Sequence, residues 1–423
     1  MEVEINKHLR HNFMVNVMDG AFFGFALGLA SFVTVIPLFV STMTGSAILI
    51  GLIPAIHNVG WQLPQLFTAR QVARLRRYKP MVVLMTVHER LPFLGLAAVA
   101  WFFPALGREV ALPLTFGLLI WQGLGGGLTA TAWQSMISKI IPARRRGLFF
   151  GTQSAAANLL ASGGAVLAGI LLERLDSPPD WTLCFLLASS SLAVSWVFLA
   201  RTWEPEHSPA NVSEDQSDFW NGVGAILQRD VNFRWFLVTR LLSHMAMAAF
   251  SFYTIYAVRH HGLSEGTVGL MTGALLAIQV AANPIMGWMG DRWSHRAVME
   301  VGALAAVVSA LLAWLAPDTT WFYLVFILAG VANVTFWTTA LTLTLEFGAE
   351  AERPTYIGLA NTLVAPGAIL APLIGGWLAD AAGYPATFLT SAVCGLFTAL
   401  ILHVMMQDPR PASCCRPRPI GND

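Results

Sequence analysis

Long apolar segments constrain this chain more than any other feature of its sequence. A helix that crosses a bilayer needs about 20 consecutive, mostly apolar residues. Twelve segments of the chain meet this requirement. We expect spanning helices at residues 13–41, 46–69, 81–104, 111–138, 147–171, 181–201, 233–258, 265–289, 297–316, 321–346, 355–379 and 385–406. Only 12% of the residues are charged, whereas a soluble domain carries roughly 25%. The sequence therefore predicts an all-α integral membrane protein.

One long polar stretch divides the spans six and six. We expect an N-terminal half at 1–201, a linker at 202–230, a C-terminal half at 231–408 and a tail at 409–423. The two halves also repeat, because offsets of 220, 204 and 207 residues align matching residues in chain order. The matched pairs include Pro64 with Pro284, Trp133 with Trp337, and Gly151 with Gly358. Two parallel six-helix halves explain this pattern.

The distribution of Lys and Arg predicts the orientation, since cytoplasmic loops carry an excess of these residues. The chain has 25 Lys and Arg, of which Arg90 and Arg240 lie within spans and away from their ends. Three more, Arg108, Arg174 and Arg259, lie on the side opposite the termini, which leaves 20 on the side of the termini. We therefore expect a multi-pass protein of the plasma membrane with both termini in the cytoplasm.

The loop between the spans 265–289 and 297–316 carries the most specific motif. It reads Gly287-Trp-Met-Gly-Asp291-Arg292-Trp-Ser-His-Arg296. This string resembles the G-x-x-x-D-R-x-x-x-R signature of major facilitator superfamily transporters. The resemblance implies the superfamily fold, in which a substrate site lies between two six-helix halves near the middle of the membrane. The first half normally carries the same signature, but here that position, Phe67 to Arg74, has no acid.

Charged loops near this motif predict a cytoplasmic gate, because the resemblance implies that these loops meet when the cytoplasmic side closes. We expect Asp291 to engage Arg146 and the positive N-terminal end of the span 147–171. We also expect an acidic run to face the basic loop 70–79. That acidic run comprises Glu346, Glu350 and Glu352, with Arg353 beside it. The alternative is that the basic loops only set the topology.

Ionisable residues inside spans are costly and are functional candidates. In the span 233–258, Arg240, His244, Met247, Ser251 and Thr254 recur at spacings of 4, 3, 4 and 3, which places them on one helix face. We expect Asp19 to face Arg240 or to share a polar substrate group with it, and to be a proton-coupling site; a static ion pair is the alternative. Glu89 and Arg90 favour an internal structural network over a transport site.

Other residues are candidates for lining the cavity or for shaping its helices. Aromatic, amide and imidazole groups suit an amphiphilic solute, and they are His57, Gln122, Trp133, Gln134, Asn333 and Trp337. For His57, a hydrogen-bonded structural histidine is the favoured interpretation. Gly20 and Gly24 are interpreted as a close-packing face or as part of the cavity. The stretch Gly367 to Gly376, with Pro372 and Gly375, is similar to the antiporter motif of drug exporters and predicts a helix that can bend.

The resulting hypothesis is a secondary active transporter that moves a small organic, amphiphilic solute by alternating access. Proton-coupled efflux is the favoured mode; nutrient uptake, a uniport carrier, or a non-transporting membrane scaffold are the alternatives. The chain has no G-x-x-x-x-G-K-[ST] loop for nucleotide phosphates, and no enzyme activity, cofactor or metal is expected. The expected partners are a small-molecule substrate, the lipid bilayer and protons, not nucleic acid, and we expect a monomer.

Overall fold

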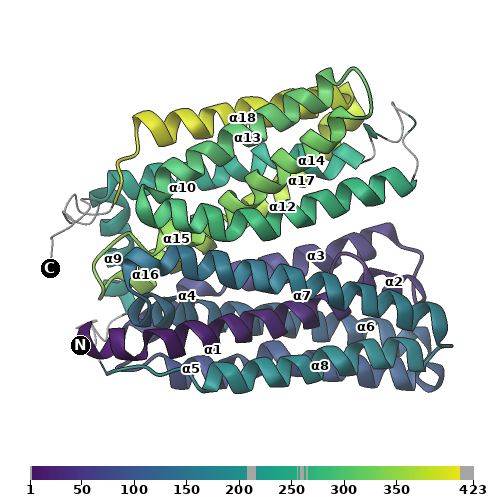
Figure 1. Cartoon of the computed structure of the whole chain (residues 1–423). Helices are drawn as coiled ribbons and strands as arrows, with labels where there is room; N and C mark the ends of the chain where they lie inside the picture. The colour runs from purple at the N-terminus through teal and green to yellow at the C-terminus, as the bar shows by residue number, and fades with distance from the viewer. Residues whose placement is uncertain (1, 207–215, 255, 258–261, 263–264, 410–423) are drawn as a thin grey trace, which may run out of the picture. The chain divides into compact units, whose positions relative to one another are not determined.

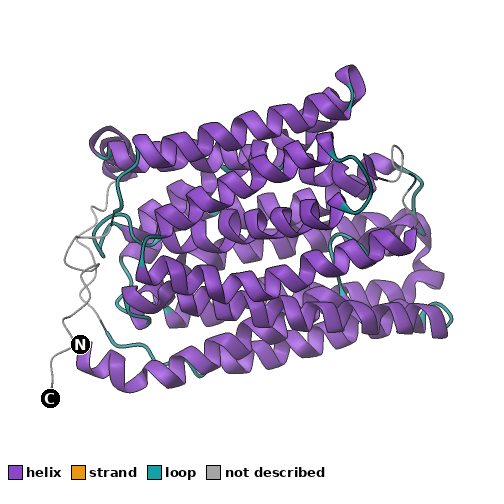
Figure 2. Ribbon diagram, turned by 45° about the horizontal axis from the view of Figure 1, so that its top comes forward, coloured by secondary structure: helices purple, strands orange, loops and turns teal. Residues whose placement is uncertain are grey.

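The computed structural model describes residues 2–206, 216–254, 256–257, 262 and 265–409, and these residues are overwhelmingly helical, with no strand among them (Figure 2). Each predicted span coincides, over its described residues, with one helix or with consecutive helices. Residues 410–423 of the predicted tail and 207–215 of the predicted linker lie outside the described residues.

The helices of the first half are α1 Glu2–Leu29, α2 Val35–Ser41, α3 Ala47–Gln62, α4 Gln65–Ala73, α5 Lys79–Met85, α6 Val87–Ile140, α7 Arg146–Arg174 and α8 Pro179–Ala200 (Figure 1). Helix α6 holds the predicted span 111–138 and most of the span 81–104, which begins in α5. They are separated at Gly107, whose φ of 68° lies in the left-handed region that glycine adopts without a steric penalty.

The helices after the linker are α10 Val231–Ala246, α12 Glu265–Arg292, α13 His295–Leu315, α14 Trp321–Val334, α15 Ala340–Thr344, α16 Arg353–Thr362, α17 Ala365–Ala382 and α18 Tyr384–Val404. A 3-10 turn at Ala248–Phe252 continues α10, and a π-helical turn at Thr335–Thr339 joins α14 to α15. The predicted linker also contains a helix that we did not expect, α9 at Gln216–Arg229, which buries Val223 and Ile226.

The chain divides into two compact units that exchange one segment each. Unit 1 comprises residues 1–141, 153–214 and 349–369, and unit 2 comprises 142–152, 215–348 and 370–423. The beginning of α7 thus belongs to unit 2, although the rest of the helix belongs to unit 1. Helix α16, from the second half of the sequence, belongs to unit 1.

Each unit has its own apolar core. In unit 1, α1 packs beside α8, and α3 and α8 pack on α6 (Figure 1). Phe39, Phe93 and Phe185 are buried in its core. In unit 2, α13 packs between α14 and α18, and α10 packs on α18. Tyr253 and Phe388 are in contact within that core.

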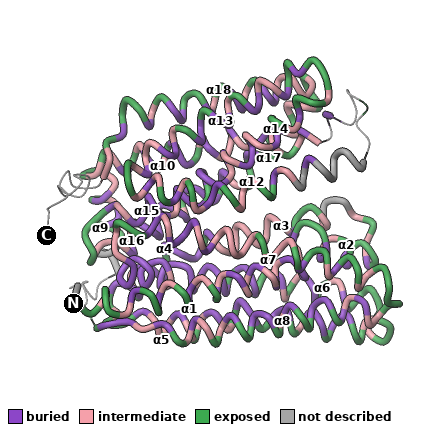
Figure 3. Tube along the Cα trace, in the orientation of Figure 1, coloured by how far each residue is buried: buried purple, intermediate pink, exposed green. Residues whose placement is uncertain are grey.

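The outer faces of these helices are apolar as well. On α18, exposed apolar residues recur at helical spacing, at Leu389, Val393, Leu396, Leu400 and Val404. The trace of α18 accordingly alternates between exposed and less exposed stretches (Figure 3). A helix that is apolar on its exposed side as well as its buried side suits lipid rather than water. By length and composition, nine helices within the described residues could cross a membrane, and one of them holds the two spans of α6.

Candidate functional site

Asp291, at the end of α12, bonds to the first turn of α7 within unit 2. One carboxylate oxygen accepts from the backbone N–H of Gly147 at 2.8 Å, and the other accepts from the N–H of Leu148 at 2.7 Å. The first N–H groups of a helix have no partner within the helix and carry a partial positive charge. The expected contact between Asp291 and this helix end is therefore present.

Glycine makes this contact sterically possible. A Cβ atom added to Gly287 would lie 2.0 Å from the carbonyl oxygen of Gly147, and one added to Gly147 would lie 2.3 Å from the carbonyl oxygen of Gly287. One turn further on, a Cβ atom on Gly151 would lie 2.2 Å from the carbonyl oxygen of Asn283. The two helices thus cross at backbone contact, which only glycine permits.

His295 lies between the carboxylates of Asp291 and Glu346. Its Nδ1 lies 2.6 Å from Glu346 Oε1, its Nε2 lies 3.6 Å from Asp291 Oδ1, and all three side chains are at most 7% exposed. We expected Glu346 to face the basic loop 70–79; that loop belongs to unit 1, and the partner that the structure gives Glu346 within unit 2 is His295. Glu346 points into unit 2 because His295, the first residue of α13, supplies its partner there.

Two of the four basic gate candidates bind backbone carbonyl groups at helix ends. Arg296 donates to the carbonyl groups of Leu402 and Met406, both at 2.8 Å, and so caps the C-terminus of α18. Arg146 donates to the carbonyl of Leu345 at 3.4 Å. The guanidinium of Arg292 lies over the ring of Trp288. In unit 1, Arg353 donates to the hydroxyl of Ser138.

Unit 1 contains a similar close helix crossing, between α16 and α4, but without a counterpart of Asp291. A Cβ atom on Gly358 of α16 would lie 2.7 Å from Cα of Leu66, which matches the approach of Gly151 to Asn283 in unit 2. Gln65 Oε1 accepts from Asn361 at 2.7 Å and from Gln134 at 3.3 Å. A neutral amide network thus occupies the half in which the sequence motif lacks its carboxylate. Sequence reasoning did not single out Gln65.

Sequence reasoning also missed a buried ion pair in unit 1. Glu204, from the segment predicted as a polar linker, lies 2.9 Å from Lys139 Nζ, and both side chains are 1% exposed. Glu204 also accepts from the backbone N–H groups of Tyr78 and Lys79 at 2.9 and 2.7 Å. Burial and the carboxylates of Glu350 and Glu204 raise the pKa of Tyr78 to about 12, so this phenol stays neutral.

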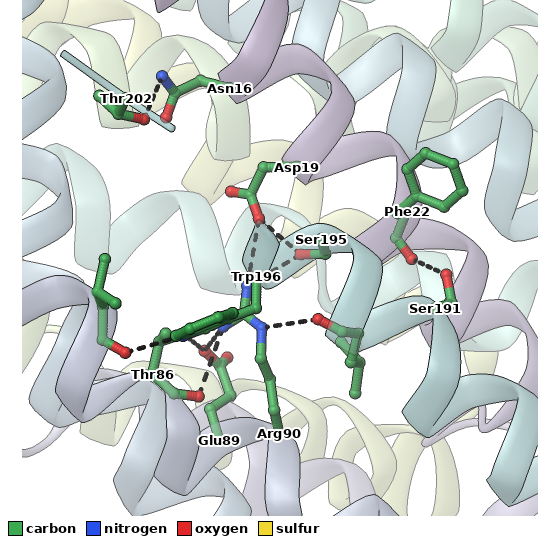
Figure 4. A network of polar contacts seen from close by, with 12 residues as sticks. Asn16, Asp19, Phe22, Thr86, Glu89, Arg90, Ser191, Ser195, Trp196 and Thr202 are labelled. Atoms are coloured by element: carbon green, nitrogen blue, oxygen red, sulfur yellow. Dashed lines mark hydrogen bonds and ion pairs between the residues drawn. The ribbon is translucent and has the colours of Figure 1, made fainter. Parts of the chain in front are cut away.

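Asp19 belongs to a buried network in unit 1 (Figure 4). Its Oδ1 lies 3.2 Å from Arg90 Nη2 and accepts from Ser195 at 2.5 Å. Glu89 lies 3.9 Å from Arg90. We expected Asp19 to face Arg240; the partners that the structure gives Asp19 within unit 1 are Arg90 and Ser195, and Arg240 belongs to unit 2. The face of α1 that carries Asp19 points toward α6 and α8, which the sequence spacing alone does not reveal.

Arg240 and His244 lie one turn apart on α10 in unit 2. Arg240 is buried, and its guanidinium lies 6.0 Å from the ring centroid of Phe236. His244 Nε2 is buried and has no hydrogen-bond partner among the described residues. The expected polar face of this helix is thus present as far as His244, after which the chain continues as a 3-10 turn at residue 248.

The remaining cavity candidates are held by local contacts. His57 Nδ1 lies 3.0 Å from Gln122 Oε1, and its ring stacks on Phe32 at 4.0 Å, as favoured for a structural histidine. Asn333 accepts from Gln279 at 3.3 Å. Trp133 is half-buried, and Trp337 is 52% exposed.

The glycine candidates on α1 and α17 pack against neighbouring helices. A Cβ atom on Gly24 would lie 2.2 Å from the carbonyl oxygen of Ala157, and one on Gly20 would lie 2.4 Å from Gln153 Cγ, so both pack against α7 in unit 1. In unit 2, Gly375 and Gly376 pack near Phe252. Helix α17 runs through Pro372 and Gly367 without interruption.

Comparison with known proteins agrees with this architecture. The family model described as Major Facilitator Superfamily matches residues 89–264 and 236–419. The E. coli fucose:proton symporter FucP has a similar structure, with a TM-score of 0.76 at 16% identity, over 93% of this chain and 98% of that one. This likeness confirms the fold predicted from the sequence.

Two similar sequences come from actinobacteria. An uncharacterized protein of Mycobacterium tuberculosis is 24% identical over 308 residues, which cover 69% of this chain and 56% of that protein; the chain thus spans little more than half of this relative. The gentisate transporter of Corynebacterium glutamicum is 24% identical over 334 residues, or 76% of this chain and 73% of that protein. From the family match, which extends over most of the sequence, we conclude that this multi-pass membrane protein belongs to the Major Facilitator Superfamily.

Proposed function

We propose that the protein is a secondary active transporter that moves a small organic solute by alternating access. In this proposal it acts as a monomer, without a cofactor, and is driven by protons. Its family and fold are those of transporters. The gentisate transporter among its relatives is consistent with an organic solute. The contact of Asp291 with the start of α7 carries the proposal, because it is a contact that transport by alternating access must make and break.

The proposed orientation places both termini in the cytoplasm of a cell bounded by its plasma membrane. It rests on the excess of Lys and Arg in the loops on the side of the termini. With this orientation, Asp291 and the first turn of α7 form a cytoplasmic gate. The second contact of the gate is α16, where Gly358 meets Leu66. Opening toward the cytoplasm requires both exchanged segments to leave the units in which they pack.

The proposed proton site is the network of Asp19, Glu89 and Arg90. Two carboxylates share one guanidinium there, so the network carries a net charge of −1 when all three groups are ionised. A net charge is expensive in a membrane interior, and binding one proton would neutralise it. Such a group can exchange a proton during each transport cycle without further charge compensation.

The proposed direction is export. It rests on the tryptophans at equivalent positions of the two halves, Trp133 and Trp337, since half-exposed indoles suit amphiphilic compounds. Import is the alternative, and the transport assay below distinguishes the two. In proton-coupled export, protons and solute move in opposite directions. In proton-coupled import, protons and solute move in the same direction.

The experiment is a proton-flux assay in proteoliposomes that enclose a pH-sensitive dye. Aromatic acids, amphiphilic cations and sugars are added to vesicles with the native protein, the Asp19→Asn variant, or the Asp176→Asn variant. Asp176 is exposed and serves as the matched control. We expect one solute class to evoke proton movement in the native and Asp176→Asn proteins, and not in Asp19→Asn. Proton movement that survives in Asp19→Asn would rule out this network as the coupling site. If no solute evoked movement in the native protein, proton-driven transport of these classes would be ruled out.

A further inference from the structure

Arg240 differs from the other buried cations of the described residues. The buried Lys and Arg side chains there are Arg90, Lys139, Arg146 and Arg240. Arg90 pairs with Asp19, Lys139 pairs with Glu204, and Arg146 donates to the carbonyl of Leu345. Arg240 is only 5% exposed, yet no hydrogen bond or ion pair joins its guanidinium to a described residue of unit 2.

The surroundings of Arg240 on its own helix do not compensate the charge. The hydroxyl of Thr239 donates to the carbonyl of Phe236 at 2.7 Å, and the hydroxyl of Ser243 donates to the carbonyl of Arg240 itself at 2.7 Å. Both hydroxyls are therefore used locally. An arginine stays protonated in proteins, and a buried charge without a partner is strongly unfavourable. Arg240 thus weakens the fold when nothing else is bound, which favours a role in binding.

His244 adds a second unused polar group beside it. The two residues are four positions apart on α10, a spacing that places side chains on one face of a helix. His244 Nε2 is buried and has no hydrogen-bond partner among the described residues. The face therefore presents one fixed positive charge and one further imidazole nitrogen, with the ring of Phe236 next to the guanidinium.

We propose that Arg240 and His244 bind the carboxylate of a small organic anion. The planar guanidinium matches a carboxylate with two parallel hydrogen bonds, and His244 can donate a third. The proposal rests on the proposed function and deepens it by naming the substrate class; gentisate, after which one relative is named a transporter, is also the anion of an organic acid.

Binding to the purified full-length protein in detergent tests this proposal independently of transport. The probes are benzoate and gentisate as anions, benzamide as the neutral analogue of benzoate, and tetraphenylphosphonium as a cation. We expect both anions to bind and to raise the melting temperature, and benzamide and the cation to do neither. Equal binding of benzoate and benzamide would overturn the proposal.

Variants separate the role of Arg240 from a general effect on folding. Arg240→Gln is expected to weaken anion binding at least about 30-fold, the usual consequence of removing one partner of a buried charge pair. The anion affinity of Arg240→Lys should lie between those of the native protein and Arg240→Gln, since lysine keeps the charge but cannot form the two parallel hydrogen bonds of a guanidinium. Without ligand, Arg240→Gln should melt no lower than the native protein, because it removes an uncompensated charge. Unchanged benzoate affinity in Arg240→Gln would overturn the proposal.

Two further variants complete the binding experiment. His244→Gln should weaken benzoate binding about tenfold, as expected for losing one hydrogen bond to a charged group, and it provides a test even if Arg240→Gln does not fold. Arg108→Gln, at an exposed position, should bind benzoate like the native protein. Anion binding without solute-evoked proton movement would support this inference while contradicting proton-driven transport. Transport of cations or sugars without anion binding would overturn this inference and leave the transport proposal standing.

Discussion

The carboxylate of Asp291 accepts a hydrogen bond of 2.8 Å from the backbone N–H of Gly147. This bond joins the last turn of α12 to the first turn of α7, and it pairs a negative charge with the positive end of a helix dipole. The second oxygen of Asp291 bonds to Leu148. The contact therefore depends on the charge, on two acceptor oxygens and on the absence of a side chain at Gly147.

Replacing Asp291 by asparagine should loosen the start of α7. An amide has only one acceptor oxygen, so one of the two N–H groups loses its partner, at a cost of about 1–3 kcal/mol. Hydrogen exchange of the backbone amides in residues 146–152 should become about 5- to 150-fold faster. Asp318→Asn is the control, since Asp318 is exposed and accepts a hydrogen bond from the nearby backbone N–H of Thr320. Unchanged exchange in Asp291→Asn would show that the carboxylate does not hold this helix end.

Two alanine substitutions on α7 should have opposite effects on stability. Gly147→Ala places a methyl group 2.3 Å from the carbonyl oxygen of Gly287, and such overpacking costs about 1–3 kcal/mol. Gly163→Ala meets no atom within 4 Å, and it should stabilise the helix by about 0.5–1 kcal/mol. Thermal unfolding in detergent compares the two. A Gly147→Ala protein as stable as Gly163→Ala would contradict the close backbone crossing.

The Asp19 network should respond asymmetrically to its substitutions. Arg90→Gln leaves two buried carboxylates, Asp19 and Glu89, without a counter-charge and should cost about 3–5 kcal/mol. The double variant Asp19→Asn/Arg90→Gln should recover part of this loss, because it removes one of the uncompensated charges. The melting temperatures of the two single variants and the double variant form a mutant cycle. Strict additivity in that cycle would contradict a direct pair between Asp19 and Arg90.

Substitutions of Glu204 and Glu206, which both follow α8, should differ sharply in their effect on stability. Glu204→Gln breaks a buried pair with Lys139, whose side chain is 1% exposed, and should cost about 3–5 kcal/mol. Glu206→Gln removes an exposed pair with Arg77, at 63% and 52% side-chain exposure, and should change stability by at most about 1 kcal/mol. Chemical or thermal unfolding of both variants checks this difference. Equal effects would mean that the Glu204 pair contributes no more than a surface contact.

Features that depend on local patterns could be predicted from the sequence. The helical spans follow from their apolar composition, and the break at Gly107 falls between two predicted spans. The contact of Asp291 with the start of α7 was predictable because the motif has a defined place in the superfamily. Helix α9 could have been found too, since Val223 and Ile226 lie three residues apart on one helix face.

Partners that depend on helix rotation could not be predicted. Asp19 lies one residue from the glycine face of α1, and a turn of about 100° per residue directs its side chain to Arg90. The contact of Glu346 with His295 within unit 2 likewise depends on how the turn after α15 directs the Glu346 side chain. Glu204 lies beside Pro205 in a segment without periodicity, so nothing in its sequence indicated a buried ion pair.

Counterflow measures carrier activity most directly. Proteoliposomes are loaded with unlabelled gentisate and diluted into a trace of labelled gentisate, with benzamide and tetraphenylphosphonium run in parallel. A transporter that alternates access to an anion site should accumulate labelled gentisate transiently, saturate with concentration, and lose this accumulation in Arg240→Gln but not in Arg108→Gln. Labelled gentisate that only equilibrates without overshoot, or that enters empty and protein-containing vesicles equally, would contradict alternating-access transport of an organic anion.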